Sequence, residues 1–257
     1  MAHRSSSTAV GAIRLTNVAK DHLLPDGNRL RVLENISFET ADHSFTSILG
    51  PSGCGKSTIL NLIAGLDNHS SGEISIGADR IGFVFQQPRL LNWRTVADNV
   101  MLPLEQQNFE KDALRALAQK YLGLVGLAGH ENYYPLQLSG GMQQRVAIAR
   151  ALAIDPDILL MDEPFSGLDE ITARKLRQEL IRIWQETGKT ILFVTHSISE
   201  SVFLSQQILI VSAKPATIFK RLTIDLPYPR EYGDLRLFEI ETNLTKDFLG
   251  MDAGHSQ

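Results

Sequence analysis

A glycine-rich loop between an expected strand and an expected helix constrains the fold of this chain more than any other feature. Residues 50–57 read Gly-Pro-Ser-Gly-Cys-Gly-Lys-Ser and fit the pattern G-x-x-x-x-G-K-[ST]. The segment Phe45–Leu49 before the loop is typical of a strand, and a helical stretch follows from Ser57. Backbone N–H groups at such a helix N-terminus converge on an anion, so the pattern predicts a cradle for a phosphate chain.

Two side chains of this loop have the chemistry that a phosphate chain and its metal ion require. Lys56 is expected to reach the β- and γ-phosphates, and the Ser57 hydroxyl is expected to bind Mg²⁺. Cys54 is the single cysteine of the chain, which excludes an intrachain disulfide and fits a reducing compartment. The predicted nucleotide-binding residues of this segment are Gly50, Pro51, Ser52, Gly53, Cys54, Gly55, Lys56, Ser57 and Thr58.

Strand-like and helix-like segments alternate over much of the remaining chain, which predicts an α/β fold with a largely parallel central sheet. Residues 88–150 carry little strand character, and apolar residues at three- and four-residue spacing predict an amphipathic helix near 113–125. The expected strands are Ile36–Glu39, Phe45–Leu49, Ile74–Ile76, Ile81–Phe85, Asp157–Met161, Thr190–Thr195 and Gln207–Ser212, and further helices are expected over Ile171–Thr187 and Asp234–Phe248.

We therefore divide the chain into five segments. Residues 1–12 are Ser-rich and are expected to be a disordered N-terminus. Residues 13–87 form the first part of the core with a β subdomain and the phosphate loop, and residues 151–214 complete that core. Residues 88–150 form a helical subdomain between them. The sequence leaves open what the C-terminal extension 215–257 does.

The charge balance and the hydropathy argue against several classes of function. The 25 basic and 29 acidic residues give a net charge of −4, which does not indicate a nucleic-acid-binding stripe. No apolar run approaches the roughly 20 residues that a membrane-spanning helix needs, and Met1–Ile13 lacks the apolar segment of a secretory signal. We expect a soluble cytoplasmic protein.

Two carboxylates follow the expected strand Asp157–Met161. Asp162 can help to hold Mg²⁺ across from the phosphate loop, and Glu163 can polarise an attacking water if it stays ionised. An Asp-Glu pair after a strand is by itself most often a solvated turn. Its place downstream of a phosphate loop makes it the predicted metal-binding and base pair.

A second glycine motif points to a family. The run Leu138–Arg145, which reads Leu-Ser-Gly-Gly-Met-Gln-Gln-Arg, resembles the signature sequence of ATP-binding-cassette ATPases, the engines of ABC transporters. Gln86 resembles the family's Q-loop glutamine, Asp169 its D-loop residue and His196 its switch histidine. These elements occur in the family's order over about residues 13–215. The resemblance implies a P-loop NTPase (RecA-like) core with a mostly parallel sheet, an antiparallel β subdomain and an α-helical insertion.

The resemblance also implies how these residues act and with which cofactors, ATP and Mg²⁺. Ser139, Gly140 and Gly141 would close on the γ-phosphate held by a second subunit, so that two chains sandwich two nucleotides head to tail. His196 would hydrogen-bond the γ-phosphate, and Asp169 would lie across the dimer seam. The implied catalytic residues are Lys56, Gln86, Glu163 and His196, and the implied metal ligands are Ser57, Gln86 and Asp162.

One position departs from the family pattern. The family places an aromatic ring against the adenine just after the first strand, and by spacing that position is His22. An imidazole stacks more weakly than a larger aromatic ring, and the neighbouring Leu23–Leu24 pair is the alternative contact.

A single cassette without a membrane span resembles the separate ATPase subunit of a bacterial-type importer. Gln86–Val96 and Asp225–Arg230 resemble segments of nitrate, sulfonate and taurine importers, although Asn92 replaces a proline common there. The resemblance implies uptake of a small anionic solute of that kind. A soluble ABC-type ATPase that remodels or regulates a nucleic-acid or ribosomal complex is the alternative.

The importer reading implies specific partners and a location. The chain would pair with a second ATPase subunit, expected to be a copy of itself, and would bind an integral-membrane permease at the cytoplasmic face of the membrane. A periplasmic or extracellular solute-binding protein would act with it indirectly, and no nucleic acid is expected. Leu90, Leu91 and Trp93 are expected to contact a short cytoplasmic helix of the permease.

Overall fold

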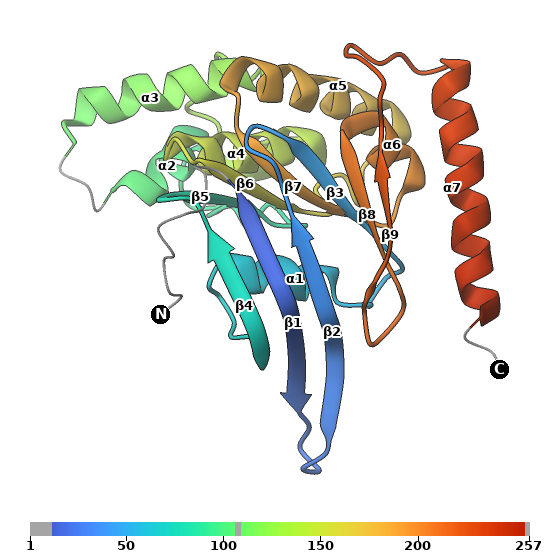
Figure 1. The fold of residues 1–257 in the computed structure, drawn as a ribbon. Coiled ribbons are helices and arrows are strands. Elements are labelled where there is room, and N and C mark those ends of the chain that lie inside the picture. The colour runs from blue at the N-terminus through green and yellow to red at the C-terminus, as the bar shows by residue number, and fades with distance from the viewer. Residues whose placement is uncertain (1–11, 106–108, 255–257) are drawn as a thin grey trace. The chain divides into compact units, whose positions relative to one another are not determined.

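The computed structural model describes residues 12–105 and 109–254 (Figure 1), and the chain divides into two compact units. Unit 1 contains the described residues up to Gly77 and from Leu192 onward, and unit 2 contains the described residues of Ala78–Ile191. The expectation of a disordered N-terminus falls almost entirely on residues outside the described ones. The segment boundaries expected at 87, 150 and 214 stay a prediction.

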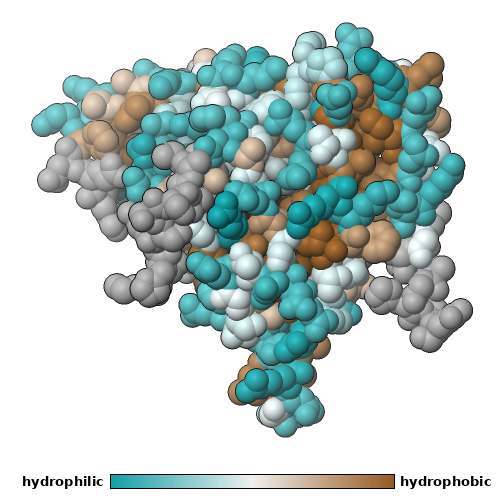
Figure 2. Space-filling view, viewed as in Figure 1, coloured by the Kyte–Doolittle hydropathy of each residue, from teal (hydrophilic) through white to brown (hydrophobic). Residues whose placement is uncertain are grey.

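Unit 1 contains an antiparallel sheet of three strands, β1 (Ile13–Leu23), β2 (Arg29–Glu39) and β4 (Ser71–Ile76). Their order is β2-β1-β4, and Figure 1 shows β1 and β2 as a long hairpin. The turn at its end is closed by the Leu24 N–H, which donates to the Asn28 carbonyl at 2.8 Å, and Gly27 adopts φ 84° there. The end of this hairpin exposes Leu23 and Leu30 among hydrophilic residues (Figure 2).

The second sheet of unit 1 runs β7 (Thr190–Thr195), β3 (Phe45–Leu49), β8 (Gln207–Val211) and β9 (Ile218–Thr223). β3 and β8 pair in parallel and β8 and β9 antiparallel. All residues of β3 and β7 are buried, as is typical of strands inside a parallel sheet, and this includes polar residues such as Thr46 and Ser47. The helices of this unit are α1 (Lys56–Ile63), α6 (Ile198–Leu204) and α7 (Leu235–Gly254), and α6 packs on β3 and on α7.

Unit 2 pairs β5 (Ile81–Val84) in parallel with β6 (Ile158–Asp162). The helices α2 (Val96–Met101), α3 (Lys111–Leu124) and α4 (Gly140–Ala153) pack on one another. The buried Asn99 of α2 donates to the carbonyl of Leu91 and accepts from its N–H, which ties the loop before α2 to that helix. The remaining elements are the 3₁₀ turns η1 (Leu102–Leu104) and η2 (Pro135–Gln137) and the helix α5 (Glu170–Thr187).

The predicted α/β class is confirmed, including the parallel strands, the antiparallel β subdomain and the helical insertion. Boundaries differ by a few residues, and one difference matters for the site. The strand expected over Asp157–Met161 runs one residue later, so Asp162 is its last residue rather than the first after it. Within residues 12–105 and 109–254, no helix has both the length and the hydropathy of a bilayer span.

An ion pair joins β1 to the segment before β4. The Lys20 ammonium, on a largely buried side chain, donates to Asp67 Oδ1 at 2.6 Å and to the Asn68 carbonyl at 2.7 Å. The hydrogen bond from Lys20 holds the pKa of Asp67 below its ordinary value. The pair therefore stabilises the folded state above the pKa of about 4 that the carboxyl has in the unfolded chain, and this contribution is lost as the pH falls below that value.

We predict that Asp67→Asn lowers the free energy of unfolding by about 1 kcal/mol at pH 7, because an amide replaces a charge-assisted acceptor. At pH 3.5 and below, the difference between the variant and the wild type should shrink. Urea unfolding at both pH values measures it, and a difference of equal size at the two pH values would contradict the role of the carboxylate.

Candidate nucleotide-binding site

The phosphate loop lies in unit 1, between β3 and α1, as the sequence predicts. Gly53 and Gly55 have φ of 75° and 122°, a region that side chains with a Cβ rarely adopt. Gly50 is glycine for another reason, since a Cβ there would lie 2.4 Å from Val211 Cγ2 on β8. The loop is therefore built so that its backbone, rather than side chains, faces an incoming ligand.

Lys56 supplies a positive charge at this loop. Its Nζ donates to the carbonyls of Gly50 and Pro51, both at 2.9 Å, and the residue is only 4% exposed. The N-cap residue of α1, Gly55, makes no side-chain cap hydrogen bond, and the first turn of the helix contains no acidic residue. A helix N-terminus of this kind, with a lysine folded over the preceding loop, fits a phosphate chain.

The switch histidine lies in the same unit. His196 is exposed directly after β7, and the carbonyl of the preceding Thr195 accepts from the Gly50 N–H at 3.4 Å. Behind it, Thr195 Oγ1 donates to Glu200 Oε2 at 2.6 Å and accepts from the Ser197 N–H at 3.0 Å. Ser197 in turn caps α6 by accepting from the Glu200 N–H at 3.3 Å. Unit 1 thus brings the phosphate loop and the histidine together on neighbouring strands.

Sequence reasoning missed the support behind His196. Ser197 and Glu200 have the S-x-x-E spacing that marks a helix N-terminus, so the cap was readable from the sequence. The contact of Glu200 with the Thr195 hydroxyl was not, because it depends on how the strand ends.

Unit 2 holds the predicted carboxylates and Gln86. Asp162 ends β6, and Glu163 follows with φ 41°, a left-handed conformation that is uncommon for a residue with a Cβ. Such strain persists only where the surrounding structure imposes it, and it is frequent at functional sites. Gln86 Nε2 donates to Ser166 Oγ at 3.3 Å, and the Ser166 N–H donates to the Glu163 carbonyl at 3.1 Å. Gln86 and the turn of Glu163 are therefore joined through Ser166, a contact that the sequence pattern did not predict.

The signature motif begins the helix α4. Ser139 is the N-cap residue, and its Oγ accepts from the Met142 N–H at 3.4 Å. No acidic residue lies in the first turn of α4. Gly140 is exposed, whereas Gly141 is buried against α5, where a Cβ would lie 2.6 Å from Thr172 Cγ2. The motif thus presents a second helix N-terminus with the character of an anion site.

Asp169 is the N-cap residue of α5. Its Oδ1 accepts from the Thr172 N–H at 3.0 Å, and hydrogen bonds from the Thr172 side chain and backbone hold the pKa of Asp169 below its ordinary value. The carboxylate is exposed and ionised. It has a structural role in its own subunit, and the role expected across a dimer seam stays a prediction.

The adenine contact stays a prediction as well. His22 is exposed on β1, where it pairs with Leu30 of β2. Leu23 is 76% exposed and Leu24 is half-buried. Both expected contacts therefore lie on the hairpin, and neither is favoured by the geometry.

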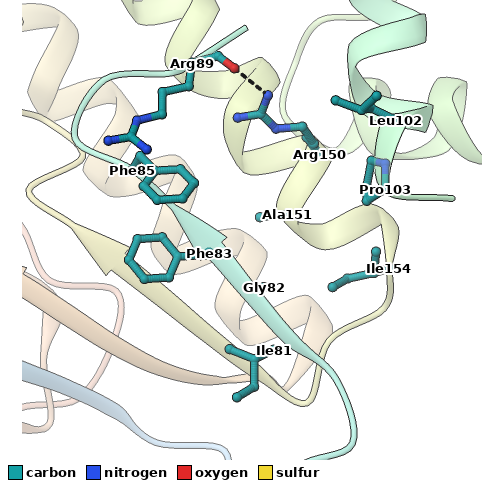
Figure 3. Close-up of a pocket in the computed structure, with 10 residues that line it drawn as sticks. All are labelled: Ile81, Gly82, Phe83, Phe85, Arg89, Leu102, Pro103, Arg150, Ala151 and Ile154. Carbon is teal, nitrogen blue, oxygen red and sulfur yellow. Dashed lines mark hydrogen bonds between the residues drawn. The ribbon is translucent and has the colours of Figure 1, made fainter. Parts of the chain in front are cut away.

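A cavity of about 360 Å³ lies next to the Gln86 segment in unit 2 (Figure 3). Phe83 and Phe85 stack with centroids 4.4 Å apart, and the Arg89 guanidinium lies 4.3 Å from the Phe85 ring centroid. Arg150 on α4 donates to the carbonyls of Pro88 and Arg89 at 2.6 and 2.9 Å. Burial lowers the pKa of Arg150. The cavity has an apolar lining from β5, α4 and η1, with Arg89 and Arg150 at one side.

The donor set fits the cofactors implied above. Ser57 offers a hydroxyl oxygen, Asp162 a carboxylate and Gln86 an amide oxygen, and oxygen ligands of this kind are those that Mg²⁺ prefers. The glycine loop and Lys56 fit the phosphates. Unit 1 holds Ser57, and unit 2 holds Asp162 and Gln86.

The strand, glycine loop and helix, together with the carboxylates at the end of β6, define a P-loop nucleotide-binding protein. Comparison with known proteins narrows the class. Residues 33–166 match the family model described as ABC transporter. The chain belongs to the ABC transporter family as an ATP-binding cassette, and it is an ATPase of that family.

Relatives match most of the chain. An uncharacterised ABC transporter ATP-binding protein of Methanocaldococcus jannaschii is 46% identical over 86% of this chain and 87% of its own length. The aliphatic sulfonates import ATP-binding protein SsuB of Bacillus cereus is 44% identical over 85% and 89%. The taurine import ATP-binding protein TauB of Yersinia pestis is 46% identical over 75% and 78%.

Solved structures agree on the fold. A dimeric ATP-binding cassette in a post-hydrolysis state bound to ADP and Pi superposes with a TM-score of 0.73 at 35% identity. A dimeric bacterial ABC transporter cassette superposes with a TM-score of 0.74, also at 35% identity. Each match covers 86% of this chain and all of the compared chain. The predicted fold and family are confirmed, whereas the roles of individual site residues stay predictions.

The contact of Gly141 with α5 yields a test of the signature helix. We predict that Gly141→Ala lowers the free energy of unfolding by about 1–3 kcal/mol, because the new methyl overlaps Thr172 Cγ2. Adding Thr172→Ser removes that methyl and should restore most of the loss. Thermal or urea unfolding measures both.

Gly140→Ala is the matched control, since its Cβ would lie 3.6 Å from Leu168 Cδ2, an ordinary contact. Equal stability of the Gly140→Ala and Gly141→Ala variants would show that the close approach to α5 does not decide the identity of residue 141.

Proposed function

We propose that this chain is the ATPase subunit of an ABC importer, acting as a head-to-tail dimer that drives uptake of a small anionic solute through a separate permease. The observation that carries the proposal is the presence of two anion-binding helix N-termini in one chain, at α1 and at α4. One phosphate chain needs only one of them. A second copy uses the other if each γ-phosphate is gripped by α1 of one subunit and α4 of the next.

The similarity to dimeric cassettes supports this arrangement. The placement of the phosphate loop in unit 1 and of the signature helix α4 in unit 2 supports it as well. In the proposed cycle, the Gly50–Thr58 loop and Lys56 bind the triphosphate, and the partner's signature helix closes on it. Mg²⁺, held by Ser57, Asp162 and Gln86, would offset charge on the phosphate oxygens.

Glu163 then orients and deprotonates water at its carboxylate, and His196 donates a hydrogen bond to the γ-phosphate. The Gly50–Thr195 hydrogen bond links the histidine to the phosphate loop, so that the loss of the γ-phosphate can change both together. Closing and opening of the dimer would move the permease.

The solute class rests on the relatives. SsuB and TauB are named for the import of aliphatic sulfonates and taurine, and we propose a sulfonate-, taurine- or nitrate-like anion for this chain. A solute-binding protein outside the membrane would deliver it, and this subunit would lie at the cytoplasmic face, bound to the permease. Importer names among these relatives favour this function over the remodelling of a nucleic-acid or ribosomal complex.

The loop after Gln86 is the proposed docking surface for the permease. Trp93 is 75% exposed, and Leu90 and Leu91 are half-buried. Arg150 fixes the start of this loop through the Pro88 and Arg89 carbonyls, beside the apolar cavity of Figure 3. A permease helix with apolar side chains and a negative charge or C-terminal carbonyls toward Arg89 would fit.

The first test concerns Glu163. We predict that Glu163→Gln keeps MgATP binding but lowers kcat at least about 100-fold, because the amide cannot accept the proton of water. ATP-bound dimer should accumulate, which size-exclusion chromatography with and without ATP detects. Glu239→Gln, an exposed glutamate on α7, is the control and should keep wild-type turnover.

Wild-type turnover in Glu163→Gln would remove Glu163 from its role. Turnover per chain that never changes with protein concentration, together with an inert Ser139→Ala substitution, would contradict the shared site.

The second test concerns Trp93. We predict that Trp93→Ala leaves the basal ATPase of the isolated subunit within about 2-fold but weakens binding to the permease by about 10-fold or more, as loss of an aromatic anchor does. Comparing ATPase with and without reconstituted permease measures both. The control is Phe238→Ala, which removes an exposed aromatic side chain far along the chain, on α7, and should leave permease binding unchanged. Undiminished permease binding by the Trp93 variant would refute the docking surface.

A further inference from the structure

The C-terminal extension closes the end of α6. The Arg230 guanidinium donates to the carbonyls of Val202, Phe203 and Ser205, at 2.7, 3.2 and 2.8 Å. The Tyr228 hydroxyl donates to the carbonyl between them, that of Leu204, at 2.7 Å. Four consecutive carbonyls at the end of α6 therefore have side-chain donors from one short segment of the extension.

These are carbonyls that a helix cannot satisfy by itself. The last four C=O groups of any α-helix lack an intrahelical N–H partner. Here residues 201–205 are buried, and Arg230 is only 5% exposed. A guanidinium at a helix C-terminus also complements the helix dipole. Tyr228 and Arg230, in what we call the closing segment, thus donate the hydrogen bonds that water often donates to the last carbonyls of a helix.

The closing segment is itself held firmly. The Arg230 guanidinium lies 4.2 Å from the centroid of the Tyr228 ring and donates to the Leu226 carbonyl at 3.1 Å. Tyr232 stacks on Phe203 of α6, with centroids 4.1 Å apart and planes 7° from parallel. Burial raises the pKa of Tyr228 to about 12, so its hydroxyl stays a donor at physiological pH.

The opposite end of α6 begins at Ile198, two residues after His196. Ser197 is the N-cap residue, and Thr195 and Glu200 fix the first turn. The helix has only seven residues, about 10 Å of rise, so a shift of its C-terminal end moves its N-terminal end as well. The helix also packs on β3 and on α7, and Arg230 adds hydrogen bonds at its C-terminal end.

We propose that Arg230 is a positioning residue for hydrolysis: by holding the C-terminal end of α6, it keeps His196 at the place where the γ-phosphate is read. The proposal rests on the proposed function of His196. It assigns a role to the extension, which acts on the rate of the chemical step rather than on nucleotide binding, because Tyr228 and Arg230 donate to the end of α6 and not to the phosphate loop.

The first experiment compares Arg230→Met with Arg230→Lys in the full-length chain. We expect Arg230→Met to lower kcat about 10-fold while KM for ATP and the affinity for MgADP stay within about 2-fold. Arg230→Lys, which keeps a charge but can reach fewer carbonyls, should lie between the variant and the wild type. Arg236→Met, which removes an exposed arginine paired with Asp234 in the same extension, is the matched control and should turn over normally.

The second experiment asks whether Arg230 acts through His196. In a His196→Ala background, Arg230→Lys should change the residual kcat by less than about 1.5-fold, because the group that it positions is gone. Where Arg230→Met does not fold, Tyr228→Phe carries the test: it removes one hydroxyl from the Leu204 carbonyl and should lower kcat about 3-fold, again only when His196 is present.

The outcomes separate this proposal from the function on which it rests. An unchanged kcat in Arg230→Lys and Tyr228→Phe, or equal proportional losses with and without His196, would overturn the positioning role and leave the ATPase intact. Full activity of His196→Ala would instead overturn the role of the histidine itself.

Discussion

A phosphate chain can lie against the start of α1 only because the backbone there is not covered by side chains. Gly53 and Gly55 adopt conformations that a Cβ would oppose, and Gly50 has no room for one beside Val211. Lys56 folds its ammonium back over the same loop. Other parts of unit 1 are arranged around this loop: β3 delivers the chain to it, and the strand that ends in Thr195 holds its first N–H. His196 therefore follows the strand whose last residue, Thr195, is bonded to the phosphate loop.

Unit 2 contains a second helix N-terminus, at the start of α4, that also lies at glycines. The start of α4 is a helix N-terminus preceded by a serine and flanked by glycines, and the buried Gly141 lets it approach α5. In the proposed dimer, each triphosphate would meet the start of α1 from one subunit and the start of α4 from the other. Two half-sites within one polypeptide explain a dimer more simply than they explain a monomeric enzyme. In unit 2, Glu163 has a strained backbone and is linked to Gln86 through Ser166. Both side chains follow strands of that unit, Gln86 after β5 and Glu163 after β6.

Local pattern predicted most of the fold, for reasons that particular segments make clear. The strands β7 and β8 are mostly apolar runs, and β3 is followed directly by the glycine loop, so each could be predicted from its own sequence. The glycine loop and the signature motif are contiguous, and so they were found. What could not be predicted depends on residues far apart in the chain. Gly141 meets Thr172, Gln86 meets Ser166, and Arg230 meets the end of α6, between 25 and 28 residues away. The left-handed backbone of Glu163 has no sequence signal, since glutamate does not favour it.

The C-terminal extension shows why such distant contacts matter for function. Its sequence resembled a group of importers at Asp225–Arg230, but resemblance does not say what those residues do. Their hydrogen bonds do: Tyr228 and Arg230 donate to four carbonyls at the C-terminal end of a short helix that begins two residues after His196. A helix of about two turns transmits displacement because its backbone hydrogen bonds are short and cooperative, and it has no internal hinge. The closing segment is therefore coupled to the start of α6, and so to His196 just before it, whether or not the segment approaches the nucleotide.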